Sequence, residues 1–99
     1  MRSDAHTKVT LRHRVLPSTD VLAQPVGGES ILLDLASEQY FGLDTVGARI
    51  WELLADSGNL QQVHATLCDE FTGNPAQIES DLLALLQKMT DAGLVTIVE

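Results

Sequence analysis

The apolar and polar positions of this chain follow two different periods, one before residue 44 and one after it. The first part contains three short extended runs: Val21–Val26, Ser30–Leu35 and Gln39–Leu43. Gly27 and Gly28 separate the first two runs, and a Gly-Gly pair favours a tight hairpin turn because such turns need positive φ angles. Residues 36–38 form the second turn region. This pattern predicts a three-stranded antiparallel meander.

Helical periodicity follows the meander and predicts three helices, beginning at Thr45, Leu60 and Pro75. Each start is preceded by a residue type that caps helices, and each end is followed by a glycine. The caps are Asp44, Asn59 and Asn74, and the glycines are Gly58, Gly73 and Gly93. A last apolar run over 94–98 predicts a final strand. The predicted fold is α+β and winged helix-turn-helix-like: a three-stranded antiparallel N-terminal sheet packed on a three-helix bundle with a short C-terminal strand.

Composition agrees with one globular domain. The chain has 99 residues, of which 44% are hydrophobic, and no apolar run approaches the roughly 18 residues that a membrane helix needs. The N-terminus lacks the apolar block of a signal peptide. Cys68 is the single cysteine, so no internal disulfide can form. We expect a reducing, cytoplasmic location and no membrane partner.

Charge is distributed unevenly along the chain. Residues 1–14 contain four basic residues against one acid, a local balance of +3, whereas residues 15–99 contain two basic residues and thirteen acids, a balance of −11. This asymmetry predicts a basic, solvated N-terminal arm over 1–16 and a folded, acidic domain over 17–99.

A winged-helix DNA-binding regulator is the alternative function that this arrangement suggests, since the second and third helices are joined by a short turn and followed by a strand. Its basic face would come from five residues: Arg2, Lys8, Arg12, Arg14 and Arg49. The helix that would read DNA, however, begins with Gln77, Glu79 and Asp81, and two acids near phosphates weaken binding to any sequence. We therefore expect no nucleic-acid partner.

Catalytic chemistry has little support in this sequence. The three histidines are far apart, and His64 in the second predicted helix is interpreted as a surface or half-buried side chain. Cys68 in the same helix is interpreted as a buried or half-buried, inert thiol. The chain has no phosphate-binding glycine loop and no nucleophile motif. We therefore predict a protein that is not an enzyme and that uses no cofactor or metal.

The edges of the predicted meander differ in a way that suggests a function. Pro25 in the first strand lacks an amide donor and discourages further pairing, whereas the third strand has only Glu38 at its start to do so. Addition of an extended peptide to this strand would use the open edge. Coverage by the third helix or by the N-terminal arm is the alternative. The third helix has a wide apolar arc, from Ile78 to Leu83. One part of this arc could line a groove beside the strand, or the whole arc could be packed against the core.

Four motifs, taken in order, resemble the PqqD-like family of RiPP recognition elements, which bind leader peptides of ribosomally made, modified peptides. The motifs are Ile31-Leu-Leu-Asp-Leu35, Tyr40-Phe-Gly-Leu-Asp44, Gly47-Ala-Arg-Ile-Trp-Glu-Leu-Leu54, and Ile78-Glu-Ser-Asp-Leu-Leu-Ala-Leu-Leu86 with Gly93-Leu94. The resemblance extends over about residues 16–95. Asp44 stands where many members have asparagine, and either residue serves as a helix cap.

This resemblance implies a function and a site. It implies a non-catalytic adaptor that captures the leader of a precursor peptide by β-strand addition and presents it to a partner enzyme. A radical-SAM enzyme would fit pyrroloquinoline quinone assembly, and a leader peptidase would fit a lasso-peptide pathway. Trp51 and Ile50 are expected in the core. The implied peptide-binding residues come from the third strand and the third helix: Glu38, Gln39, Tyr40, Phe41, Gly42, Leu43, Ile78, Asp81, Leu82, Leu85 and Lys88. The open edge also leaves room for a weak homodimer or a strand exchange.

Overall fold

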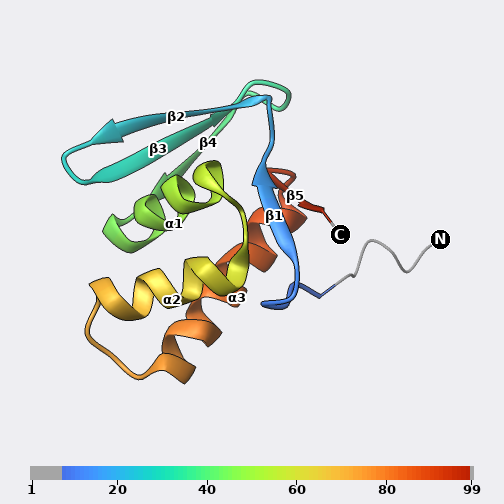
Figure 1. The fold of residues 1–99 in the computed structure, drawn as a ribbon. Coiled ribbons are helices and arrows are strands. Elements are labelled where there is room, and N and C mark those ends of the chain that lie inside the picture. The colour runs from blue at the N-terminus through green and yellow to red at the C-terminus, as the bar shows by residue number, and fades with distance from the viewer. Residues whose placement is uncertain (1–7, 99) are drawn as a thin grey trace.

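The computed structural model describes residues 8–98 and confirms an α+β chain with three helices and antiparallel sheets (Figure 1). Its elements, in chain order, are β1 (Arg14–Pro17), β2 (Val21–Val26), β3 (Glu29–Asp34), β4 (Gln39–Leu43), α1 (Thr45–Asp56), α2 (Leu60–Glu70), α3 (Pro75–Asp91) and β5 (Val95–Val98). None of the helices within residues 8–98 is long and apolar enough to cross a membrane.

The predicted meander is present as a three-stranded sheet with the order β2-β3-β4. Gly27 and Gly28 form the first turn at φ 59° and 90°, values that L residues with a side chain rarely adopt. In the register of the sheet, Leu33 lies opposite Leu22 on one side and Tyr40 on the other. The strands β2 and β4 are therefore the two edges.

The N-terminal part of the chain differs from the expected arm. β1 crosses the predicted boundary between residues 16 and 17 and pairs with β5 in a separate two-stranded antiparallel sheet. Val9 and Val15 are buried, and the Val9 amide donates to Gln87 Oε1 at 3.0 Å. Residues 8–16 are thus part of the packed domain because their apolar side chains complete its core. Residues 1–7 of the expected arm lie outside the described residues.

Side-chain caps begin the three helices where the sequence predicts them. Asp44 accepts from the Gly47 amide at 2.8 Å, Asn59 from the Gln62 amide at 3.1 Å, and Asn74 from the Ala76 amide at 2.8 Å. Each of these bonds satisfies an amide that has no partner within its helix. The caps consequently fix where each helix starts relative to the preceding turn.

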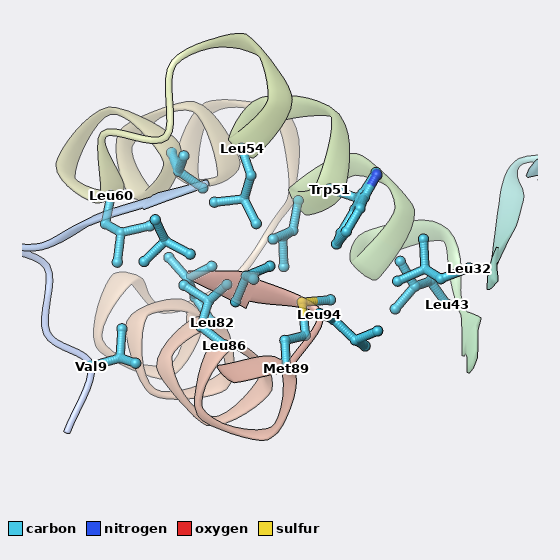
Figure 2. Packing of buried hydrophobic residues seen from close by; sticks show 14 of the residues in the cluster. Val9, Leu32, Leu43, Trp51, Leu54, Leu60, Leu82, Leu86, Met89 and Leu94 are labelled. Carbon is cyan, nitrogen blue, oxygen red and sulfur yellow. The ribbon is translucent and has the colours of Figure 1, made fainter. Parts of the chain in front are cut away.

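The core lies between the helices and extends to the inner side of the three-stranded sheet (Figure 2). Trp51 and Ile50 are buried, as expected. Figure 2 shows Val9 and Leu60 at one end of the cluster, with Leu32 and Leu43 at the other. One core therefore joins the N-terminal segment, the helices and the sheet.

The two faces of β3 have opposite surroundings. Leu32 is fully buried and Asp34 is nearly so, because this face lies on α1. Asp34 accepts from the Ser37 hydroxyl at 2.9 Å and from the Ala36 amide at 3.1 Å, so its buried carboxylate is hydrogen-bonded. Ile31 and Leu33, on the other face, point away from the helices. The more apolar face of this strand is therefore the outer one.

Candidate functional site

The edge of β4 is open within the part of the chain that the structure describes. β4 pairs with β3 on one side, and no described strand lies on its other side. No described backbone hydrogen bond outside that ladder involves residues 39–43. Backbone amide and carbonyl groups along this edge are therefore available to an added strand.

A hollow of about 270 Å³ lies between β4 and the second half of α3. Its lining is almost wholly apolar, and Lys88 is its one residue with a charged side chain. The lining residues are Phe41, Gly42, Leu43, Leu85, Lys88, Met89, Ala92 and Leu94. A strand added to β4 would lie over this hollow, so that every second side chain points into it.

A larger hollow of about 500 Å³ lies between the start of α1, the end of α2 and the first half of α3. Its walls are also mainly apolar, with two carboxylates. The lining residues are Asp44, Val46, Gly47, Ile50, Leu67, Phe71, Thr72, Ile78, Asp81, Leu82 and Leu85. Leu85 belongs to both hollows. The two hollows therefore adjoin along α3 and together form what we call the α3 groove.

Charge differs between the two ends of the α3 groove. Lys88 lines the end beside β4, whereas Asp44 and Asp81 line the end beside α1 and α2. Asp44 is engaged as the cap of α1, and Asp81 accepts from Gln77 Nε2 at 2.9 Å. A bound peptide would thus meet a cation at one end and carboxylates at the other, which favours one direction of a peptide that carries charges of both signs.

The structure brings most of the predicted site residues to the α3 groove. Phe41, Gly42, Leu43 and Lys88 line the smaller hollow, Ile78, Asp81 and Leu82 the larger one, and Leu85 both. Glu38, Gln39 and Tyr40 line neither, and the Tyr40 side chain is 72% exposed on the outer face of the sheet. Leu82 is 1% exposed, so it forms the floor of its hollow and belongs equally to the core.

Sequence reasoning missed the part of the groove that α1 and α2 contribute. Val46, Phe71 and Thr72 line the larger hollow, as do the buried Gly47 and Ile50. In the sequence, Phe71 continues the apolar stripe of the second helix. Nothing in this stripe indicates that its last residue lies outside the core. Val46 is exposed in the first turn of α1, but in the sequence it belongs to the apolar stripe of that helix, so its exposure could not be predicted.

His64 and Cys68 are close together but lack the arrangement of a catalytic pair. His64 Nε2 lies 2.9 Å from the Pro75 carbonyl oxygen and 3.5 Å from Cys68 Sγ. A carbonyl only accepts, so Nε2 carries the proton and has no lone pair with which to take one from the thiol. Among residues 8–98, no three metal-binding side chains form a group.

Comparison with known proteins places this geometry in a family. The model of coenzyme PQQ synthesis protein D (PqqD) matches residues 29–95. A search of curated proteins gave no match. TbiB1, solved in complex with the TbiA(beta) leader peptide, is 31% identical with a TM-score of 0.77, and the match covers 81% of this chain and 93% of that one.

A second solved structure, lasso peptide synthetase B1 complexed with the leader peptide, shares the fold at a TM-score of 0.71 and 21% identity. That match covers 84% of this chain and 98% of the other. Together with the family model, which spans well over half of the chain, these likenesses identify the chain as a PqqD-like protein: it belongs to the PqqD family.

Proposed function

We propose that this protein is a non-catalytic adaptor that captures the leader of a ribosomally synthesised precursor peptide by β-strand addition to β4. The observation that carries the proposal is an open strand edge beside an apolar groove. The edge supplies backbone partners over residues 39–43, and α3 supplies the facing wall through Ile78, Leu85 and Lys88. Peptide recognition by strand addition uses these two parts together.

In strand addition, the backbone of β4 and the apolar side chains of the α3 groove have separate roles. Backbone hydrogen bonds to β4 give affinity that depends little on peptide sequence, and side chains entering the two hollows give selectivity. We expect affinities from micromolar to high nanomolar, roughly −8 to −9 kcal/mol, because the buried area is modest and the peptide must become ordered. Phe41 and Leu85, both partly buried, are the apolar contacts that a bound peptide would cover.

Similarity to TbiB1 supports the same function. That protein was solved in complex with a leader peptide, and the present chain shares 31% of its residues over most of both chains. In this proposal α2 and α3 correspond to the helix-turn-helix of a winged helix and β5 to its wing. These elements bind a peptide in place of DNA. The first turns of α3 present Glu79 and Asp81, which disfavours the alternative of a DNA-binding regulator.

The proposed partners are the precursor leader and an enzyme that receives it. A radical-SAM protein or a leader peptidase would be that enzyme, depending on the pathway. The adaptor itself carries no chemistry in this proposal, since His64 and Cys68 lack the geometry of a base and a nucleophile. A cytoplasmic location and a weak homodimer through the β4 edge remain predictions from the sequence.

An amide NMR titration tests this function directly. The titrant is a synthetic leader from a short open reading frame beside the gene, and duplex DNA serves as a parallel control. We expect leader-induced shifts in residues 38–43 and along Ile78–Lys88, with no response to DNA. Shifts caused by DNA in α3, with all candidate leaders silent, would overturn the adaptor function in favour of the regulator.

A further inference from the structure

The outer side of the β2-β3-β4 sheet is an exposed apolar surface. We call it the outer apolar face, and it consists of Leu22, Val26, Ile31, Leu33, Leu35 and Tyr40. Leu22, Leu33 and Tyr40 lie directly opposite one another across the three strands. Five of the seven large hydrophobic side chains exposed in the described residues belong to this face. Such a concentration on one surface marks an interaction site, whereas scattered apolar residues do not.

No element within residues 8–98 covers this face. Figure 1 shows the helices on one side of the three-stranded sheet, with α1 beneath β3 and β4. Leu32, on the inner side, is fully buried, whereas Leu22, in the next strand on the outer side, is 55% exposed. The core of the domain is therefore complete without the outer residues, which contribute little to folding.

The size of the face fits a weak or transient partner. Three strands about 4.8 Å apart and about six residues long, at roughly 3.4 Å per residue, give a surface of a few hundred Å². Patches of that size occur at functional sites on monomers, and small interfaces are typical of partners that associate and dissociate repeatedly. A processing enzyme that must release its product is such a partner.

Charge around the face limits what it can bind. Residues 17–48, which include the whole sheet, contain five acids and no lysine or arginine. Glu29 lies at one end of the sheet beside the glycine turn, and Asp20 and Glu38 lie at the other end. A second copy would bring these acids against each other, and nucleic acids or anionic membranes would also be repelled. The complementary surface is an apolar patch surrounded by lysine and arginine.

We infer that the outer apolar face docks the peptide-processing enzyme, through an apolar patch with a basic rim. This inference rests on the proposed function, in which the leader occupies the β4 edge and the α3 groove. The two surfaces lie on different sides of the sheet and meet at β4, whose Tyr40 side chain points outward. One small domain can therefore hold the leader and the enzyme at the same time.

The test measures binding of two probes to the same variants. The probes are the synthetic leader and the purified enzyme, encoded beside the gene, that cleaves or modifies the precursor. The variant L22T/I31T removes two exposed apolar side chains and keeps residues that suit strands. Val98→Thr is the control, since Val98 is an exposed apolar residue of the other sheet. Neither substituted position of the double variant lines the α3 groove.

We expect L22T/I31T to bind the enzyme at least tenfold more weakly and the leader within twofold of wild type, and V98T to bind both normally. Glu29→Lys should weaken enzyme binding as well, whereas Asp69→Lys on the exposed side of α2 should not. Unchanged enzyme binding by L22T/I31T, with normal leader binding, would overturn the docking face alone. Failure of the wild-type protein to bind any leader would overturn the proposed function and the inference together. A dimer that L22T/I31T dissociates in sedimentation would assign the face to a second copy and overturn the inference.

Discussion

The carbonyl oxygen of Gly58 accepts a hydrogen bond from the amide of Val15 at 2.9 Å, and this bond attaches β1 to the turn between α1 and α2. Arg14 adds a second link, because its Nε donates to the Ser57 carbonyl at 3.1 Å. Gly58 has a φ of 74°, and a Cβ at this position would lie 2.5 Å from the Val15 carbonyl oxygen. The closeness of the two chain segments therefore depends on a residue without a side chain.

Gly58→Ala should destabilise the protein substantially. The added methyl group meets backbone, which cannot move aside, and the left-handed φ adds strain, so we expect a loss of roughly 2–4 kcal/mol. Gly28→Ala is the matched control: its φ is 90° but no atom lies within 4 Å of its Cβ position, so about 1 kcal/mol is expected. Urea denaturation followed by Trp51 fluorescence measures both. Equal losses would show that the contact with β1 is unimportant.

Val9→Ala should lower the free energy of unfolding by roughly 1–3 kcal/mol, because it leaves a cavity beside α3. Val9 is 1% exposed and its amide is bonded to Gln87, so the residue belongs to the core. Lys8→Ala, at the exposed neighbouring position, should change little. The same denaturation experiment applies. A neutral Val9→Ala would restore the interpretation of this segment as an arm outside the fold.

Leu85→Glu should reduce leader binding by at least tenfold while the protein stays folded. Leu85 lines both hollows and is only partly buried, so a carboxylate there would be desolvated by a bound peptide but not by the free protein. Ala84→Glu places the same charge one residue away on the exposed side of α3. Isothermal titration calorimetry with the leader compares them. Similar affinities for the two variants would move the binding site away from α3.

The stability of the protein should depend on pH through the ion pair that joins Arg49 of α1 to Glu70 of α2. Arg49 donates to both carboxylate oxygens of Glu70, at 2.8 and 2.7 Å, and these hydrogen bonds lower the pKa of Glu70. A carboxyl whose pKa is lower in the folded state adds stability above its unfolded pKa and loses it as the pH falls through the folded pKa. At neutral pH, the wild-type protein should therefore melt at a higher temperature than the Glu70→Gln variant.

The difference in melting temperature between wild type and Glu70→Gln should shrink as the pH falls below the ordinary pKa range of carboxyl groups. It should vanish once the pH is below the pKa of Glu70 in the folded protein. It should be small, since the pair is exposed to solvent. In the background of Arg49→Met, the substitution Glu70→Gln should lose this pH dependence, because the cause of the pKa shift is gone. Thermal melts of the four proteins at several pH values test this. Retention of the pH dependence without Arg49 would assign it to another group.

Features encoded by neighbouring residues could be predicted from the sequence. The meander follows from Gly27 and Gly28 between extended runs, and the helix starts follow from Asp44, Asn59 and Asn74, since a cap bonds an amide two or three residues away. The open β4 edge and its α3 wall were one of two alternatives, because an unblocked strand and a wide apolar arc also fit a covered edge and a more fully packed helix. Caps and turns leave no such choice. Local chemistry suffices for such features.

Features that depend on distant partners could not be predicted in the same way. β1 has four residues and a weak alternation, and it is a strand because β5 and Gly58 supply its hydrogen-bond partners. The sequence of β3 shows that Ile31 and Leu33 share a face but not which face meets α1. The choice is made by the packing of Leu32 on that helix, which no local pattern contains.

The two sides of α3 have different roles: one side packs in the core and the other lines the groove. Leu86 faces the core, whereas Asp81, Leu85 and Lys88 face the groove at spacings of three and four residues. If the proposed site is right, substitutions on the groove side should change which leader the protein binds while its scaffold stays intact. Leu82 and Met89 are the exceptions, because both are buried in the core and also line the groove, and a redesign of specificity should leave them unchanged.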